Sequence, residues 1–222
     1  MLAIDLISDE IPPIKITDKV KNGLRWMEDF KVTELPLVDG NKFLGSISEE
    51  ELLNHANPEA KIKDSKTSLA IQDVYVFQHQ HIYELIAKIS QFKLSTIAVI
   101  DEKRNFIGLI DLPIIMRSIS KLNAMKDPGG ILELELNVND YSLAEISNIV
   151  ESNGAKILSS YIYTYDDSTK MNVTIKVNKS DLSAILQTFE RYNYNVAAFF
   201  HKSPMEDDIK KRYEAFVHYL NI

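Results

Sequence analysis

Ser48 and Glu51 are the two residues of this 222-residue chain whose types and spacing are best suited to binding chemistry. They follow the apolar Ile47 and open a stretch that favours a helix. A hydroxyl and a carboxylate at this spacing can face one cleft, where the carboxylate accepts from both hydroxyls of a ribose and the helix start favours phosphate. The same S-x-x-E pattern is also a capping box, which would start a helix at Glu49 without any ligand. Both interpretations remain open at this point.

A second segment has different residues at the corresponding positions. Asp111 replaces the hydroxyl and Ile114 replaces the carboxylate. An isoleucine side chain accepts no hydrogen bond, and Asp111 puts negative charge where a phosphate would approach. Asp111 is most simply an N-cap, with Pro113 in the first helical turn. This second segment therefore lacks the ribose acceptor of the first.

Residue patterns for catalysis or metal binding are weak. His79 and His81 could face one side of an extended segment as metal ligands, but no third ligand is near them, and an exposed turn is the alternative. The sequence has no nucleophile elbow, Walker loop or dinucleotide fingerprint, and its lack of cysteine excludes disulfides and thiolate chemistry. We predict neither an enzyme nor a metal site.

The Ser48 and Asp111 segments belong to two copies of one repeat. In each copy a helix of about three turns leads into a strand, a polar turn with aspartate, a second strand after glycine, and another helix. Val20 corresponds to Ile82 and Asp39 to Asp101, both 62 residues later, and one extra residue in the second turn puts Gly108 63 residues after Gly45. Helix, strand and turn features in register over this distance indicate a duplicated supersecondary unit.

The repeat resembles the CBS (cystathionine-beta-synthase) domain. The resemblance rests on Leu35-Pro36-Leu37-Val38-Asp39 and on Gly45 through Glu51. It covers residues 1–122, with repeats at about 1–60 and 61–122, and two such motifs in tandem resemble a Bateman module, whose clefts commonly hold adenosine nucleotides. The resemblance implies AMP, ADP, ATP or S-adenosylmethionine as the effector. The ligand-binding residues predicted on this basis are Ser48, Glu51, Thr17 and Asp111.

The second half has a different pattern. Residues 123–130 combine turn formers and indicate a linker. Beyond them, apolar patterns predict the order β-α-β-β-α-β of a ferredoxin-like fold, with the last strand at 195–200. This half, residues 131–222 with a terminal helix from about Pro204 to Tyr219, resembles an ACT domain. Amino-acid-binding ACT domains usually carry glycine in the first loop, but residues 139–142 contain none, so a structural role in dimer formation is at least as well supported.

Composition narrows the classes of protein further. A hydrophobic fraction of 45% is enough for the chain to bury hydrophobic cores. The net charge of −7, with no block of basic residues, argues against nucleic-acid binding. No apolar run has the length of a membrane helix and no export signal is recognisable, which predicts a cytoplasmic protein.

The combined prediction is an α+β fold with a tandem CBS pair of two small sheets flanked by helices, followed by the ACT-like domain. The domain order resembles bacterial acetoin-utilisation-type CBS proteins. It implies a non-catalytic homodimer that senses an adenine nucleotide or related adenosyl ligand. The alternative is a ligand-free dimeric scaffold or regulatory subunit that acts by protein–protein contact.

Overall fold

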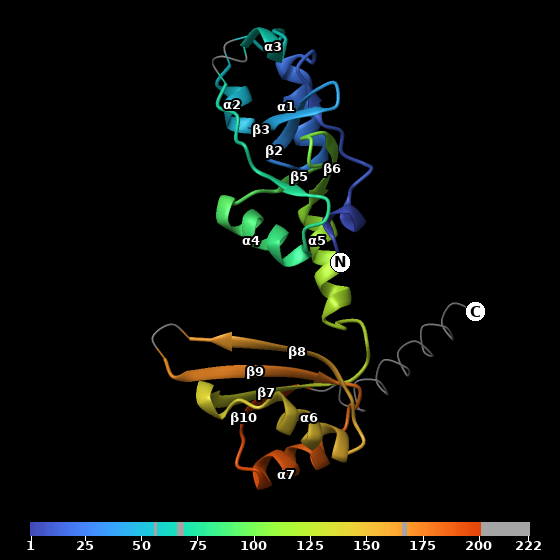
Figure 1. Cartoon of the computed structure of the whole chain (residues 1–222), viewed down its shortest axis with the longest axis vertical. Helices are drawn as coiled ribbons and strands as arrows, with labels where there is room; N and C mark the ends of the chain where they lie inside the picture. Colours follow the sequence, from blue (N-terminus) through green and yellow to red (C-terminus); the bar gives the residue numbers. More distant parts are fainter. Residues whose placement is uncertain (56, 66–68, 166–167, 201–222) are drawn as a thin grey trace, which may run out of the picture. The chain divides into compact units, whose positions relative to one another are not determined.

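The computed structural model describes residues 1–55, 57–65, 69–165 and 168–200. The chain forms two compact units, residues 1–118 and 119–222, and helix α5 runs across this boundary (Figure 1). Within the described ranges no helix is long and apolar enough to cross a membrane. The terminal helix predicted at 204–219 lies outside the described residues.

The first repeat contains a three-stranded sheet of order β1-β2-β3. Strand β1 is parallel to β2, and β2 is antiparallel to β3. The polar turn at Gly40 joins the last two strands with a positive φ of 57°, which glycine adopts without steric cost. The elements of this repeat are η1 (Ala3–Leu6), β1 (Ile14–Lys15), α1 (Val20–Phe30), β2 (Glu34–Asp39), β3 (Lys42–Ser48), α2 (Glu49–Leu53) and α3 (Ile62–Ser65).

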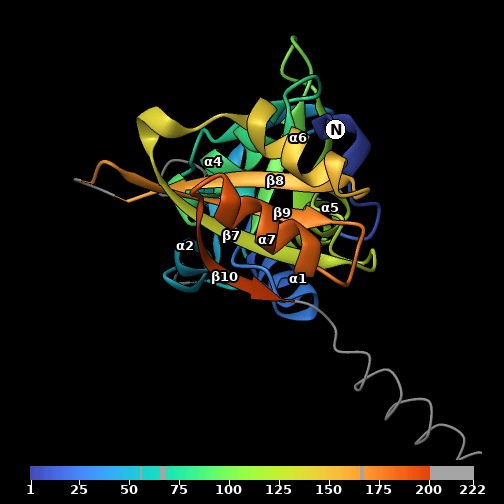
Figure 2. The same ribbon diagram turned by 90° about the horizontal axis from the view of Figure 1, so that it is seen from below.

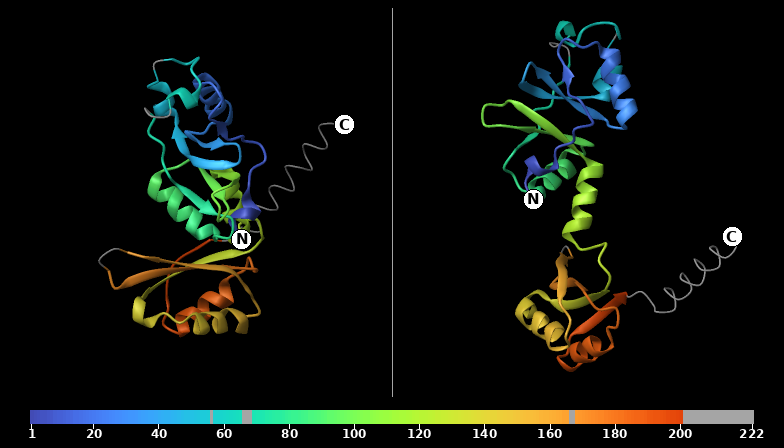
Figure 3. Two further views of the ribbon diagram at one scale, coloured as in Figure 1. Left: turned by 45° about the horizontal axis from the view of Figure 1, so that its top comes forward. Right: turned by 90° about the vertical axis from the view of Figure 1, so that its right-hand side faces the viewer.

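The second repeat has the same topology, with a sheet of order β4-β5-β6. Leu37 pairs with Ile14 and Gly45, while its counterpart Val99 pairs with Val76 and Gly108. The predicted equivalence of the two copies is therefore confirmed at the level of strand register. In Figure 3 the two copies appear as the blue to cyan and the green parts of the first unit. The elements of the second repeat are β4 (Tyr75–Phe77), α4 (Ile82–Phe92), β5 (Thr96–Ile100), β6 (Phe106–Asp111) and α5 (Leu112–Leu122).

The short parallel strands β1 and β4 were not part of the predicted repeat. They contain two and three residues, too few to produce a periodic pattern. Each forms only because the neighbouring central strand, β2 or β5, offers it a ladder.

The start of each repeat pairs with the other repeat. Gln72 exchanges two backbone hydrogen bonds with Ser46 on β3, and the Ser8 amide donates to Leu109 on β6. Strands β2 and β5 also pack against each other. Residues 1–118 are therefore one globule in which neither repeat is complete by itself.

The second unit is a four-stranded sheet of order β10-β7-β9-β8 with every neighbouring pair antiparallel. This is the strand order of a ferredoxin-like fold, so the predicted fold class is confirmed. The predicted last strand matches β10 at both ends. The elements are β7 (Gly130–Asn137), η2 (Val138–Asp140), α6 (Leu143–Ser152), β8 (Ile157–Thr164), β9 (Lys170–Val177), α7 (Ser183–Arg191) and β10 (Asn195–Phe200).

Helices α6 and α7 lie on the same face of this sheet (Figures 1 and 2). Alternate residues of the central strands, such as Leu132, Leu134 and Val173, are fully buried against Ile146 and Phe189 of the helices. The period of two that buries these side chains turns their neighbours to the opposite face. That opposite face, which carries Glu133 and Glu135, is not covered by a helix from the described residues of this unit.

Candidate functional site

Ser48 ends strand β3 and caps helix α2. Its φ and ψ of −87° and 159° are extended, and its Oγ accepts from the backbone N of Glu51 at 3.3 Å. Helix α2 begins at Glu49, as the S-x-x-E pattern predicts. The hydroxyl is therefore already used within the chain as a helix cap.

Glu51 makes a contact that the sequence pattern does not predict. In a capping box its carboxylate would return to the Ser48 backbone, but Glu51 Oε2 accepts from the backbone N of Ala70 at 3.0 Å. Ala70 lies just before Gln72, in the segment that pairs with β3. Glu51 thus fixes the start of the second repeat onto the first, and one of its oxygens is occupied.

The other two predicted ligand residues lie elsewhere. Asp111 caps α5, with Oδ1 accepting from the Ile114 amide at 2.8 Å, and only 9% of the residue is exposed. Thr17 lies in an exposed turn between β1 and α1.

A cleft of about 300 Å³ lies between the two repeats beside Ser48. Its walls come from the start of β2, the β3–α2 junction and the turn from α4 to β5. Of the four predicted ligand residues, only Ser48 is among the described residues that line it. The polar and charged side chains on its lining include those of Thr33, Glu34, Ser48, Glu49, Glu50 and Lys93.

Glu34 is the residue in this cleft that the sequence analysis missed. Only 6% of the Glu34 surface is exposed. Its Oε1 accepts from Ser95 N at 2.7 Å, Ser95 Oγ at 2.8 Å and Thr96 N at 2.5 Å, and its Oε2 accepts from Thr33 Oγ1 at 2.7 Å. Four donors satisfy most of the acceptor capacity of a carboxylate. Glu34 therefore joins the two repeats at the end of the cleft.

The repeat register gave a signal for this junction. Thr33 and Ser95 are 62 residues apart, and so are Glu34 and Thr96. The Thr33 amide donates to Ser95 Oγ at 2.8 Å, and Thr96 Oγ1 donates to the Glu34 carbonyl at 3.0 Å. Equivalent positions that lie on a pseudo-two-fold axis must meet each other, so an alignment of the copies could have identified the pair.

The charge of the cleft is mainly negative. Glu34, Glu49 and Glu50 face one cation, Lys93. A ligand with phosphate groups would bring like charges close together in a partly desolvated site, which is unfavourable. An uncharged or cationic ligand meets no such repulsion.

The two histidines of the pair contact different partners. His79 Nδ1 lies 3.4 Å from Glu102 Oε1 on the surface, while His81 caps helix α4 by accepting from the Tyr83 amide at 3.4 Å. No group of three or more potential ligands is close enough to hold a metal ion among the residues the structure describes.

A second cavity, of about 320 Å³, lies at the end of β7 in the second unit, beside the 139–142 segment. Asp140 and Glu145 line it, and Glu145 accepts from the Tyr194 hydroxyl at 2.7 Å. Partial burial of this hydroxyl, followed by its bond to Glu145, raises the pKa of Tyr194. Carboxylates on the wall oppose the carboxylate of an amino acid.

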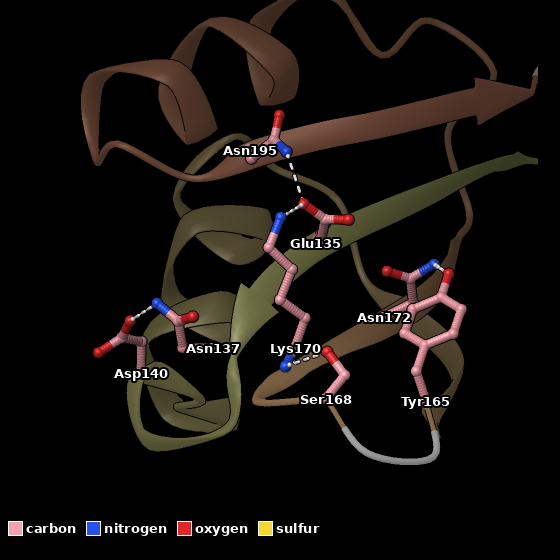
Figure 4. A network of polar contacts seen from close by, with 8 residues as sticks. All are labelled: Glu135, Asn137, Asp140, Tyr165, Ser168, Lys170, Asn172 and Asn195. Carbon is pink, nitrogen blue, oxygen red and sulfur yellow. Dashed lines mark hydrogen bonds and ion pairs between the residues drawn. The ribbon is translucent and has the colours of Figure 1, made fainter.

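Glu135 at the same cavity is held by one lysine and one asparagine of neighbouring strands (Figure 4). Its Oε1 lies 2.6 Å from Lys170 Nζ and 3.5 Å from Asn195 Nδ2. The hydrogen bond from Lys170 lowers the pKa of Glu135. Asn137 similarly donates to Asp140 at 2.9 Å. These contacts explain the polar side chains as surface cross-links of the sheet.

No family model matches the sequence. Among solved structures, the chain is similar to a CBS domain pair/ACT domain protein from Thermotoga maritima, with 16% identity over 55% of this chain and 98% of that one and a TM-score of 0.48. It is also similar to CBSX2 in complex with AMP, with 17% identity, 54% and 96% coverage and a TM-score of 0.45. A third is a CBS domain pair in complex with 5′-methylthioadenosine and S-adenosyl-L-methionine, with 19% identity, 55% and 97% coverage and a TM-score of 0.43.

These likenesses cover about half of the chain. At such identities and TM-scores they do not decide which ligand this chain binds or whether it is an enzyme.

Proposed function

We propose that residues 1–122 are a tandem CBS module of a non-catalytic regulatory protein, and that the module binds an adenosyl compound of low negative charge. The observation that carries this proposal is the cleft beside Ser48. It lies where the motif resemblance puts a nucleotide, and its volume is at the lower end of the range for small-molecule sites.

The acidic lining selects within this ligand class. Glu49 and Glu50 belong to the first turn of α2, and Glu34 closes the end of the cleft. Adenosine and S-adenosylmethionine should therefore bind better than AMP, and AMP better than ATP. Among the described lining residues, Lys93 is the one cation that would partly offset a single phosphate.

A ligand at this position can act as a regulator because both repeats contribute to the walls. Binding energy that depends on the distance between Ser48 and Lys93 would bias the arrangement of the two repeats. This is the general way in which a ligand signals without chemistry.

Calorimetry with adenosine, S-adenosylmethionine, AMP and ATP tests the proposal on the full chain. The sharp variant is the double substitution Glu49→Gln and Glu50→Gln, which removes two lining charges. We expect AMP affinity to rise about tenfold, equivalent to about 1.4 kcal/mol, while adenosine affinity stays the same. Lys93→Ala, the matched change of opposite sign, should weaken AMP and leave adenosine unaffected.

A thermal-shift panel provides an independent readout. A ligand at 100 times its dissociation constant stabilises the folded protein by about 2.7 kcal/mol. If neither method detects any adenine compound, the adenosyl proposal is wrong.

A second candidate, a ligand-free dimeric scaffold, is favoured by a different observation. Ser48, Glu51 and Asp111 already have partners within the chain. Helices of the first unit also expose large apolar side chains, with Tyr83 70% and Met116 62% exposed. Exposed apolar surface of this kind is typical of interaction sites.

The scaffold candidate predicts a homodimer, and so does the sensor. Light scattering at micromolar concentration should give twice the monomer mass of 25.4 kDa. Tyr83→Glu and Met116→Glu should lower the dimer fraction. Retained dimerisation without adenosyl binding would support the scaffold over the sensor.

The ACT-like half is proposed to have a structural role. The carboxylates Asp140 and Glu145 at the expected loop disfavour an amino-acid ligand. Calorimetry with a panel of amino acids should therefore show no binding.

A further inference from the structure

The four-stranded sheet of the second unit has one covered and one open face. The pairing register groups the open-face residues in rows across the strands. The first row runs Phe200–Ile131–Lys176–Ser159. The second runs Ala198–Glu133–Thr174–Tyr161, and the third continues through Glu135, Asn172 and Tyr163.

The open face carries an apolar region at the end where the described chain leaves the sheet. Ile131, Met125 and Tyr161 surround a hollow of about 150 Å³, and Thr174 lies beneath them with 8% exposure. Phe200 and Tyr161 are 56% and 53% exposed. Aromatic side chains of this size lose hydrophobic stabilisation when they stay in water.

This face also contains an acceptor without a partner. Asn172 donates from Nδ2 to the Tyr165 hydroxyl at 2.9 Å (Figure 4). Its buried Oδ1 has no hydrogen-bond partner within the described residues. Buried polar atoms normally have partners, so a donor from a segment outside the described residues fits this position.

The chain itself supplies a candidate to cover the face. Residues 201–222 follow Phe200, which pairs with Ile131 in the first row. The sequence predicts a helix from Pro204, with Ile209, Tyr213, Phe216 and Leu220 on one side. A helix from 204 to 219 would be about 24 Å long, close to the length of about 26 Å for the eight-residue strand β7.

The order of charges along this segment is complementary to the order of charges across the rows of the sheet. The segment has acidic residues first, Glu206 to Asp208, and basic residues next, Lys210 to Arg212. On the sheet, Lys176 lies in the first row and Glu133 in the second, and neither forms an ion pair with any other described residue. A helix that leaves Phe200 and crosses the rows puts opposite charges beside each other.

We propose that residues 204–220 form an amphipathic helix that packs its apolar side on the open face of the β10-β7-β9-β8 sheet. The contact covers Ile131, Tyr161 and Phe200 with Ile209, Tyr213 and Phe216. The occupant of this surface is thus the carboxyl-terminal segment of the same chain.

Cysteine cross-linking tests the proposal directly, because the natural chain contains no cysteine. The test pair is Glu133→Cys with Tyr213→Cys in the full-length protein, treated with a short bismaleimide at low protein concentration. We expect a cross-link within one chain, formed about tenfold faster than in the controls because packing raises the effective concentration of the two thiols.

Two controls separate packing from simple tethering. Glu133→Cys with Lys211→Cys puts the second thiol on the opposite side of the predicted helix, while Glu151→Cys with Tyr213→Cys puts the first on the exposed surface of α6. Equal rates for all three pairs would overturn the proposal. Cross-links between chains, which depend on protein concentration, would also overturn it, because the occupant would then be a second copy.

A stability comparison provides a second measurement. Phe216→Ser removes an apolar contact and should lower the melting temperature by several degrees, whereas Lys211→Ser should leave it unchanged. Equal melting temperatures for both variants and the wild type would contradict the packed helix.

Discussion

The two repeats share one topology but differ at the residues that face the junction between them. Glu34 in the first repeat corresponds to Thr96 in the second, and the side chain of each hydrogen-bonds to the backbone of the other across the junction. The carboxylate receives four hydrogen bonds and the threonine hydroxyl donates one. A symmetric fold thus holds an asymmetric contact, because a single carboxylate can satisfy donors from both halves.

The helix starts show the same principle. Ser48 and Asp111 hold equivalent positions and accept from the amide three residues later at 3.3 and 2.8 Å. An N-cap needs only an oxygen acceptor, so serine and aspartate both meet the structural demand. The two side chains differ in charge, so an aspartate at this position would repel a phosphate group and a serine would not.

The cores of the two repeats fill an equivalent space with side chains from different helices. Gly23 on α1 corresponds to the fully buried Leu85 on α4. A Cβ at Gly23 would lie 2.8 Å from Leu52 Cδ1, so the α2 side chain fills the space that Leu85 fills in the second repeat. Close packing fixes the total volume and leaves open which helix supplies it.

The largest expected effect is at the asymmetric junction. Glu34→Ala removes the shared acceptor and leaves the buried amides of Ser95 and Thr96 without it. We expect the free energy of unfolding to fall by about 3–4 kcal/mol. Thr96→Val, the matched change in the other repeat, should cost about 1 kcal/mol. Urea unfolding followed by fluorescence of Trp26, the single tryptophan, measures both.

Equal costs for these two variants would show that the repeats share the junction evenly. Glu34→Gln, which keeps the shape, would then show whether the charge contributes at all.

The next largest effect is expected at the glycines before the second helices. Gly45 has φ of 138°, and an added Cβ would lie 2.9 Å from the backbone O of Gln72. Gly45→Ala should therefore destabilise by about 2–3 kcal/mol through strain and overlap. Gly108 has no positive φ, and the three atoms nearest to an added Cβ all belong to the Ile7 side chain and none to the backbone, so a smaller cost of about 1–2 kcal/mol is expected. Thermal unfolding of the two variants would contradict this order if Gly108→Ala were the more destabilising.

The helix caps should differ less. Ser48→Ala and Asp111→Ala each remove one cap and should cost about 1 kcal/mol, with Asp111 the larger because its bond is shorter and charged. Chemical denaturation measures both, and the two replacements Ser48→Asp and Asp111→Ser should be nearly neutral. A large loss in either exchange would mean that the two capping positions are not equivalent.

The smallest effect concerns the charged residues at the starts of α1 and α4. The hydrogen bonds from Lys21 and then Lys19 lower the pKa of Glu59 to about 2, while the hydrogen bond from Gln80 lowers that of Glu84. A lowered pKa in the folded state contributes stability above pH 4.5, and this contribution is lost as the pH falls towards 2. NMR titration of the Glu59 carboxyl should give a midpoint near 2.

Replacing both Lys19 and Lys21 with alanine should return the Glu59 midpoint to its ordinary range. Gln80→Ala should raise the midpoint of Glu84 without moving that of Glu59. If the Glu59 midpoint were the same with and without the two lysines, the ion pairs of Glu59 with Lys19 and Lys21 would be contradicted.

The repeat, the βαββαβ order and the bounds of β10 from Asn195 to Phe200 could be predicted from the sequence alone. These features depend on local periodicity and on turn residues, which each segment carries on its own. The cap at Ser48 was predictable for the same reason.

Only the tertiary structure decided how the cleft is built. The Glu51 carboxylate accepts a hydrogen bond from the Ala70 amide, and Gln72 pairs with Ser46. Glu34 accepts hydrogen bonds from the backbone amides of Ser95 and Thr96, which lie 61 and 62 residues further along the chain. No local pattern encodes such contacts, because each depends on how two separately formed copies pack together. A carboxylate in a strand can face water, a ligand or a backbone amide, and the neighbour that the fold brings to it settles which.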